Sequence, residues 1–193
     1  MFSTPIRTDT SELRLYDLAP EWTARLESLA PTLELDHHPE VVVYGKVRHQ
    51  RRSIGFYSDT SIGYKYSGQI AKSRPLTPIL TELLKFINTK FGADYNGILV
   101  NKYESGEEYI GQHSDDEANL NPNIGVVAIS VGAVRKFRIC KKGTSQKYCD
   151  VPTDPTKIIQ MWGDFQREFT HGVPIEKKVR DTRYSFTFRK HIE

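Results

Sequence analysis

Two histidines and one aspartate are the first residues whose types and spacing could do chemistry. His113 and Asp115 are separated by one residue, and His171 follows later, just before Gly172 and Pro174. In an extended segment, side chains two residues apart point to the same side, so the imidazole of His113 and the carboxylate of Asp115 could reach one metal ion. His171 would then supply a third ligand.

Two imidazoles and one carboxylate are the ligand set of non-haem iron(II) sites, where they occupy three corners of an octahedron and leave three for a cosubstrate and O2. The spacing by itself is a weak signal, because a histidine and an aspartate two positions apart occur by chance in many chains. A surface pair at His113 and Asp115, with an unrelated core histidine at position 171, is the alternative interpretation.

Residues 183–189 alternate between aromatic and polar side chains, as in a β-strand with two different faces. One face would carry Tyr184, Phe186 and Phe188, and the other would carry Arg183, Ser185, Thr187 and Arg189. An arginine that faces inward needs an anion, and a guanidinium binds a carboxylate through two parallel hydrogen bonds. A small dicarboxylate between the metal and an arginine would satisfy this pattern. A solvated outer face with scattered arginines is the alternative.

The elements that must position these residues begin with two predicted helices in the first half of the chain. Pro20 stands at a favoured first-turn position of one helix; Thr77 as N-cap and Pro78 after it begin the other, which ends at Gly92. Their apolar faces consist of Trp22, Leu26 and Leu29 in the first helix and Ile79, Leu83, Phe86 and Ile87 in the second. Both helices are therefore expected to pack on a core through one side.

From about residue 97 onward, short apolar runs separated by Gly, Pro and Asn replace the helical period, which predicts strands. The expected strands cover residues 98–103, 126–131, 136–140, 157–162 and 184–188, with earlier ones at 41–44 and 63–66. Strands at this spacing, preceded by helices, fit an α+β fold in which helices support one side of an antiparallel sandwich or barrel.

Composition limits the class of protein. The chain has 193 residues, enough for one sizeable core, and no apolar run approaches the roughly 18 residues that a membrane span needs. The N-terminus has no apolar segment typical of a secretory signal, and the two cysteines make a poor disulfide framework. We expect a soluble, intracellular protein without a membrane partner; the composition does not distinguish nucleus from cytoplasm.

The net charge of +3 is too small to indicate a nucleic-acid partner, but the basic residues are clustered. The clusters are Lys46, Arg48, Arg51 and Arg52; Arg135, Lys136, Arg138, Lys141 and Lys142; and Lys177, Lys178 and Arg180. Each cluster could bind phosphates or could be an ordinary solvated face.

With His113, Asp115, His171, Arg183 and Arg189 in this order, the chain resembles the AlkB family of 2-oxoglutarate dioxygenases, and most closely the animal enzymes that repair alkylated DNA. The resemblance covers about residues 41–190. It is carried by Val43-Tyr44-Gly45-Lys46, Arg52-x4-Tyr57-x-Asp59, Tyr64-x-Tyr66-Ser67-Gly68, Asn101-x-Tyr103, Ile110-Gly111-x-His113-x-Asp115-Asp116-Glu117 and Thr187-Phe188-Arg189-Lys190.

The resemblance implies a double-stranded β-helix, the jelly-roll or cupin-like core of antiparallel strands, with supporting N-terminal helices. Within a single structural domain, residues 1–40 would form a helical extension packed on the core. Residues 41–193 would form the dioxygenase domain, with a nucleotide-recognition lid at about 41–75.

The resemblance also implies the roles of the central residues. His113, Asp115 and His171 would hold iron(II). Asn101, Tyr103 and Arg183 would bind 2-oxoglutarate, with Arg183 on the distal carboxylate. Arg189 would support the cosubstrate and the iron-bound carboxylate. Ser185 stands where the family usually has asparagine, so a hydrogen bond near the inner carboxylate would be shorter in reach or mediated by water.

Other family positions imply contacts with the nucleic acid. The residues concerned are Tyr44, Arg52, Tyr57, Asp59, Tyr64, Asp116 and Glu117. Tyr44 would fill the gap left by a flipped-out base, Arg52 would contact phosphates, and Asp116 would favour a cationic alkylated base. Tyr57 and Tyr64 could instead be ordinary half-buried sheet aromatics, and Asp116 and Glu117 a solvated acidic turn.

The implied activity is oxidative dealkylation of 1-methyladenine and 3-methylcytosine in DNA by a monomeric enzyme. The enzyme would use iron(II) as its cofactor and would consume 2-oxoglutarate and O2. The reaction would release succinate, CO2 and formaldehyde. One alternative keeps the iron site but acts on RNA, or even on a protein or small molecule. Another is a nucleic-acid binding module with an inactive or structural metal site, which the presence of all five core residues disfavours.

Overall fold

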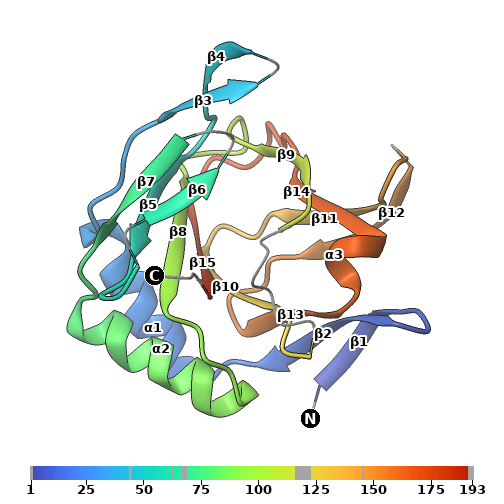
Figure 1. Ribbon diagram of the computed structural model, residues 1–193, viewed down its shortest axis with the longest axis horizontal. Coiled ribbons are helices and arrows are strands. Elements are labelled where there is room, and N and C mark those ends of the chain that lie inside the picture. The colour runs from blue at the N-terminus through green and yellow to red at the C-terminus, as the bar shows by residue number, and fades with distance from the viewer. Residues whose placement is uncertain are drawn as a thin grey trace.

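The computed structural model describes residues 2–43, 45–61, 63–66, 69–115, 123–144 and 146–190, with the backbone alone at 43, 64–66 and 69–70. Within these ranges the strands form a nine-stranded sheet, a four-stranded sheet and a two-stranded hairpin. The two larger sheets face each other, and α1 (Pro20–Leu29) and α2 (Pro78–Phe91) cover the outer face of the nine-stranded sheet (Figure 1). This is the expected jelly-roll core with helices packed on one side.

The nine-stranded sheet contains the strands on which most pocket residues lie. Its order is β1 (Phe2–Arg7), β2 (Ser11–Asp17), β13 (Lys157–Gly163), β10 (Val126–Gly132), β15 (Arg183–Arg189), β8 (Gly97–Tyr103), β5 (Ser53–Tyr57), β7 (Gln69–Arg74) and β6 (Gly63–Tyr66). Among the described pairs, β5 and β7 run parallel and the rest are antiparallel.

The four-stranded sheet carries two of the three expected metal ligands. Its order is β12 (Lys147–Pro152), β11 (Lys136–Lys141), β14 (Phe169–Val173) and β9 (Ile110–His113), and all its pairs are antiparallel. The short helix α3 (Phe165–Glu168) leads from β13 in the large sheet into β14. His113 and His171 therefore lie on neighbouring strands.

The local sequence explains both long helices. Thr77 is the N-cap of α2, where its hydroxyl accepts a hydrogen bond from the Leu80 amide at 3.3 Å, and Gly92 ends the helix with a left-handed φ of 59°. Leu80, Leu83 and Ile87 of α2 are fully buried. The predicted starts and the predicted end are confirmed. A 3-10 turn (Ala30–Thr32) follows α1 directly. Within the described ranges, no helix combines the length and apolarity that crossing a bilayer requires.

Strand alternation divides the large sheet into an apolar and a polar face. On β15, Phe186 and Phe188 pack with the two helices, while Arg183, Ser185 and Arg189 point to the space between the sheets. β8 and β10 follow the same rule. A second apolar cluster, which includes Leu13, Val126 and Phe169, fills one end of that space, so its other end is left for polar side chains.

Residues 1–40 differ from the predicted helical extension. β1 and β2 form a hairpin that joins the large sheet through β13, and α1 follows this hairpin. The reason is that Leu13 and Leu15 alternate with Glu12 and Arg14, which turns both leucines toward the cluster between the sheets. The helical description of this segment is therefore wrong, while the domain boundary near residue 41 stays a prediction.

The seven predicted strands are confirmed, as β3 (Glu40–Val43), β6, β8, β10, β11, β13 and β15. The strands β1, β2, β4 (Lys46–His49), β5, β7, β9, β12 and β14 were not predicted, nor was α3. Most of these are short or interrupted by glycine or proline, so their period is weak.

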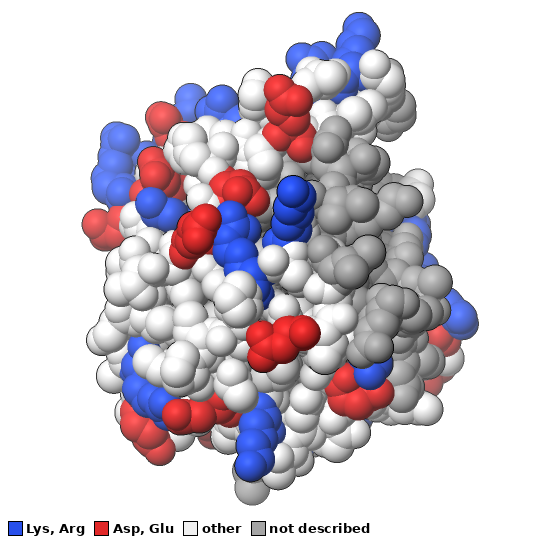
Figure 2. Space-filling view, turned by 60° about the vertical axis from the view of Figure 1, so that its left-hand side comes forward, with Lys and Arg blue, Asp and Glu red and all other residues white. Residues whose placement is uncertain are grey.

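A hairpin of β3 (Glu40–Val43) and β4 (Lys46–His49) projects from the rest of the molecule (Figure 1). Lys46 and Arg48 are exposed on β4, and basic side chains gather on this projection in Figure 2. Val47, which is 60% exposed, is the most exposed large apolar residue within the described ranges. The hairpin thus presents positive charge and an apolar side chain together.

The carboxylate of Glu168 joins α3 to the β1–β2 turn. It accepts hydrogen bonds from the hydroxyls of Thr8 at 2.9 Å, Thr10 at 2.6 Å and Ser11. Burial acts to raise the pKa of Glu168, but these three hydroxyls outweigh it, so the pKa lies below its ordinary value. A pKa that is lower in the folded state gives stability above the unfolded pKa, and that stability is lost as the pH falls through the folded value.

We expect Glu168→Gln to lower the free energy of unfolding by about 1–2 kcal/mol at about pH 7, because a charged acceptor of three hydroxyls is lost. Urea denaturation at about pH 7 and about pH 4 should show the difference from wild type narrowing at the lower pH. Glu82→Gln is the control, since its ion pair with Arg25 is exposed. An equal loss at both pH values would contradict the role of the charge.

Candidate metal and cosubstrate site

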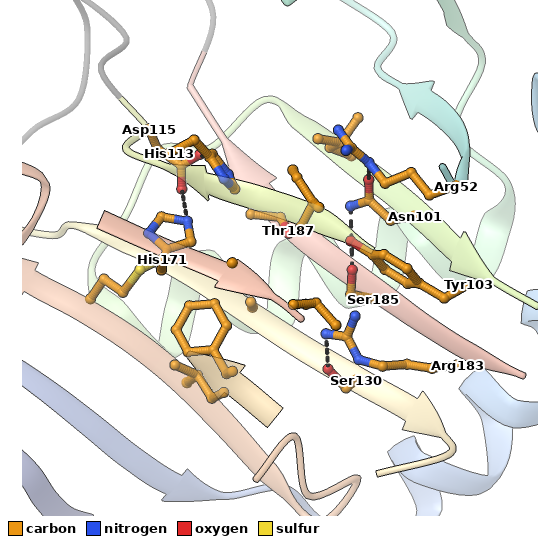
Figure 3. A pocket seen from close by; sticks show the side chains of 18 of the residues that line it. Arg52, Asn101, Tyr103, His113, Asp115, Ser130, His171, Arg183, Ser185 and Thr187 are labelled. Atoms are coloured by element: carbon orange, nitrogen blue, oxygen red, sulfur yellow. Dashed lines mark hydrogen bonds and ion pairs between the residues drawn. The ribbon is translucent and has the colours of Figure 1, made fainter. Parts of the chain in front are cut away.

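A pocket that carries both polar and apolar side chains lies between the two sheets. Its walls come from β8, β10, β13 and β15 on one side and from β9, β11 and β14 on the other. Figure 3 shows His113, Asp115 and His171 at one end of this pocket, with Arg183 and Tyr103 at the other. The pocket therefore has an end with metal-ligand types and an end with a cation.

Strand register brings the two histidines together. His113 of β9 and His171 of β14 are direct cross-strand partners, so their side chains share a face, with ring centroids 4.5 Å apart. The Asp115 carboxylate lies 3.8 Å from Nε2 of His113 and 3.3 Å from Nε2 of His171. Each of the three residues offers one ligand atom, and these three atoms lie within 4.8 Å of one another. The predicted triad is thus assembled.

Two side-chain contacts hold the segment after β9 against the neighbouring elements. The Ser114 hydroxyl donates to the Phe169 carbonyl at 3.0 Å, and the Asp115 amide donates to Oε1 of Gln166 at 2.8 Å. Because both partners lie at the junction of α3 and β14, Asp115 is fixed relative to the strand that carries His171.

His113 and Asp115 are in the protonation states that metal binding requires. Nδ1 of His113 lies 2.9 Å from the Gly111 carbonyl, which selects the tautomer with the proton on Nδ1 and leaves the lone pair of Nε2 toward Asp115. Burial, and then the neighbouring His171, lower the pKa of His113 to about 3. The imidazole is therefore neutral at physiological pH.

Asp115 is held as a carboxylate. Burial acts to raise its pKa, but Arg189 and the two histidines outweigh it, so the pKa lies well below its ordinary value. Nη2 of Arg189 donates to Oδ1 of Asp115 at 2.8 Å, and both side chains are buried. The expected support of this carboxylate by Arg189 is present.

The opposite end of the pocket holds a guanidinium with unused donors. Arg183 is 5% exposed, its Nη2 donates to the Ser130 hydroxyl at 2.9 Å, and it lies 5.1 Å from the centre of the Tyr103 ring. Its Nε and Nη1 have no hydrogen-bond partner among the described residues. Burial lowers the pKa of Arg183, and Tyr103 opposes this, yet a guanidinium stays charged in proteins. These buried donors fit the carboxylate of a small diacid.

A row of hydrogen bonds lines the pocket wall between the two ends. Register places Ser130, Ser185 and Asn101 beside one another on β10, β15 and β8. Nε of Arg52 donates to Oδ1 of Asn101 at 2.8 Å, and Nδ2 of Asn101 donates to the Ser185 hydroxyl at 3.3 Å (Figure 3). Ser185, at the position where the family usually has an asparagine, thus forms a direct hydrogen bond with Asn101.

Some residues expected to contact the nucleic acid lie elsewhere. Tyr57 follows Phe56 on β5, so alternation turns it to the helix side, where it is buried and donates to the Glu34 carbonyl at 2.8 Å. Asp59 accepts from the Leu76 amide at 2.8 Å and is exposed. The prediction of substrate contacts is wrong for Tyr57, which is a core aromatic, and Asp59 has no place in the pocket lining.

Arg52 is also placed differently from the expectation of a phosphate contact. It is 4% exposed and lines the pocket, so it does not present its guanidinium to a strand running outside. Tyr44, Asp116 and Glu117 lie outside the described residues, and only the backbone of Tyr64 is described, in β6. The predictions for these four residues stay predictions.

Two polar side chains of the pocket were not identified from the sequence as site residues. Ser130 holds Arg183, and Thr187 lies between Ser185 and Arg189 on the pocket face of β15. The signal for Ser130 is the alternation Val127, Ala128, Ile129, Ser130 in β10, which predicts a hydroxyl on the face that carries the small residues.

Comparisons with known proteins agree with this chemistry. A family model described as 2OG-Fe(II) oxygenase superfamily matches residues 18–189. The cofactors of this superfamily are Fe(II), 2-oxoglutarate and O2, and the site fits them. Two imidazoles and a carboxylate suit iron(II), and the unused donors of Arg183 suit a carboxylate.

Similar proteins include DNA oxidative demethylase ALKBH2 of Homo sapiens, 29% identical over 157 residues, with 78% of this chain and 60% of that protein covered. Alpha-ketoglutarate-dependent dioxygenase alkB homolog 3 of Rattus norvegicus is 30% identical over 149 residues, covering 72% of this chain and 50% of that protein. The chain thus spans about 50–60% of the length of these relatives.

A solved structure titled "The structure of OsALKBH1" matches with a TM-score of 0.61 at 16% sequence identity, covering 97% of this chain and 100% of that one. At this identity the match supports the fold. The family match over residues 18–189, the similar sequences and the assembled triad lead to one assignment. The chain belongs to the AlkB family within the 2OG-Fe(II) oxygenase superfamily.

Proposed function

We propose that this protein is an Fe(II)- and 2-oxoglutarate-dependent dioxygenase that removes methyl groups from 1-methyladenine and 3-methylcytosine in DNA. The observation that carries the proposal is that a His-Asp-His cluster and a buried arginine with unused donors share one pocket. The relatives named DNA oxidative demethylase support a nucleic-acid substrate.

In this proposal His113, Asp115 and His171 hold the iron, and Arg183, Asn101 and Tyr103 bind 2-oxoglutarate. Iron, 2-oxoglutarate and O2 together supply the oxidation that hydroxylates the N-methyl carbon, after which formaldehyde leaves, with succinate and CO2 as the other products. The chain itself supplies placement and electrostatics. Arg189 keeps Asp115 ionised, and Ser130 holds the guanidinium of Arg183 in one orientation.

The nucleic acid would approach the β3–β4 hairpin, where Lys46 and Arg48 are exposed and could contact phosphates without reading sequence (Figure 2). The alkylated base would leave the stack to reach the iron, because a base inside a duplex cannot enter a pocket between two sheets. Tyr44 is proposed to fill the resulting gap, and Asp116 and Glu117 to favour the cationic base. We propose that the enzyme acts as a monomer inside the cell.

The first test is a substrate panel. Wild-type protein with Fe(II), 2-oxoglutarate and O2 should remove the methyl group from oligonucleotides that carry either base, with matched production of succinate, measured by mass spectrometry. His113→Ala should reduce turnover about 100-fold or more, because the iron loses a ligand. Arg7→Gln, at a side chain that is 66% exposed, is the control and should leave turnover unchanged.

The panel also separates the alternatives. Matched single-stranded DNA, duplex DNA and RNA with the same methylated base are compared, and faster turnover of RNA would select the RNA demethylase instead. Methyl content that stays constant in all three substrates, with wild-type protein and all cofactors present, would overturn the proposed substrate class.

The second test addresses the cosubstrate end of the pocket. Arg183→Gln should raise the KM for 2-oxoglutarate by about 10- to 100-fold, because two charge-assisted hydrogen bonds are lost. 2-Oxobutyrate, which lacks the distal carboxylate, should be a poor replacement in wild type. The variant should discriminate much less between the two oxo acids. Full discrimination retained in Arg183→Gln would contradict the assignment.

A further inference from the structure

Arg135 is a buried arginine outside the expected site. It lies in the connection between β10 and β11 and is 1% exposed. Its guanidinium donates to the carbonyls of Ser105 at 2.9 Å, Glu108 at 2.9 Å and Pro174 at 2.7 Å, and to the Glu176 carboxylate at 3.2 Å. Each of its three nitrogens thus has a partner in the backbone of two loops or in one carboxylate.

Each of these loops is continuous with a strand of the site. Residues 104–109 connect the end of β8, where Tyr103 stands, to the start of β9, which ends at His113. Residues 174–176 follow β14, which carries His171. Arg135 therefore contacts the segments that hold the cosubstrate end and the metal end of the pocket.

The two loops are also bonded directly to each other. The Gly106 amide donates to the Val179 carbonyl at 2.9 Å, and the Glu176 amide donates to the Gly106 carbonyl at 2.7 Å. A Cβ atom at Gly106 would lie 1.9 Å from the Glu176 carbonyl oxygen. This contact leaves no room for a side chain, so the loop spacing is set by close backbone packing.

Tyr103 lies between Arg135 and the cosubstrate end of the pocket. Its ring is 2% exposed and lies 5.9 Å from the guanidinium carbon of Arg135 and 5.1 Å from that of Arg183. The two guanidinium groups thus both border one phenol, but they differ in their partners. Every nitrogen of the Arg135 guanidinium has a carbonyl or Glu176 as a partner, whereas Nε and Nη1 of Arg183 lack partners within the described part of the chain.

We propose that Arg135 is a positioning residue that sets the spacing between the cosubstrate end, at Tyr103 and Arg183, and the strands that carry the metal ligands. This inference depends on the proposed roles of Tyr103 and Arg183. An arginine is required because its planar group places donors in several fixed directions, whereas the single ammonium of a lysine cannot reach carbonyls of two loops and a carboxylate together.

The test is Arg135→Lys, studied by calorimetry with Mn2+ in place of iron and then with 2-oxoglutarate added to the Mn2+-loaded protein. We expect the affinity for 2-oxoglutarate to fall by roughly 10- to 100-fold, since small displacements at such a site have effects of this size. In turnover, the KM for 2-oxoglutarate should rise by a similar factor, with a smaller change in kcat. A purely structural role would lower the melting temperature alone.

The matched control is Arg138→Lys, three residues further along the chain. Arg138 is 34% exposed and pairs with Asp150 on the neighbouring strand. This variant should bind 2-oxoglutarate like wild type. Wild-type affinity in folded Arg135→Lys would overturn the proposal.

Two further variants decide the question if Arg135→Lys does not fold. Glu176→Gln removes the charge of the carboxylate that pairs with Arg135. Gly106→Ala forces the two loops apart without changing residue 135. Weaker 2-oxoglutarate binding in both supports the proposal, and unchanged binding in both overturns it. Wild-type protein that binds Mn2+ but not 2-oxoglutarate would instead overturn the proposed function, together with this inference.

Discussion

Neighbouring side chains on a β-strand point to opposite faces, and in this molecule that alternation separates core from site. On β15 the aromatic residues pack under α1 and α2, while Arg183, Ser185 and Arg189 face the space between the sheets. The same alternation on β8 places Asn101 and Tyr103 on the pocket side. A shift of one residue in the pairing of these strands would bury the arginines among the helices and expose the aromatics to the pocket.

Several buried cations lie in the pocket or, like Arg135, outside it, and each is stabilised in a different way. Arg189 is paired with Asp115, Arg52 donates to an amide oxygen, and Arg135 is surrounded by backbone carbonyls. Within the described residues, the guanidinium of Arg183 has a hydroxyl and an aromatic ring beside it and no anion, although a buried charge without an anion is strongly unfavourable. The unsatisfied charge is therefore a property of the binding end, and it explains why an anionic cosubstrate would be retained there.

The features that could be predicted from the sequence are those with a local cause. α2 has its N-cap and its terminal glycine within the segment, and β15 shows its two faces in seven residues. The triad followed from residue type, order and resemblance. Tyr57 was assigned to the pocket because it matches a family position, but the face of β5 on which it lies depends on pairing with β8. Arg135 was grouped with a basic cluster, because its partners are carbonyls that are distant in sequence and carry no residue signature.

The β1–β2 hairpin has a consequence for the rest of the large sheet. It lies along β13, so the backbone amides and carbonyls on that side of β13 are bonded to β2 rather than open. The family match begins at residue 18, after the hairpin. A chain shortened to that boundary would turn β13 into an edge strand, with Ile159 and Met161 no longer covered by Leu13. Such an edge can pair with the same strand of another molecule, so the hairpin moves the edge of the sheet from the buried strand β13 to β1.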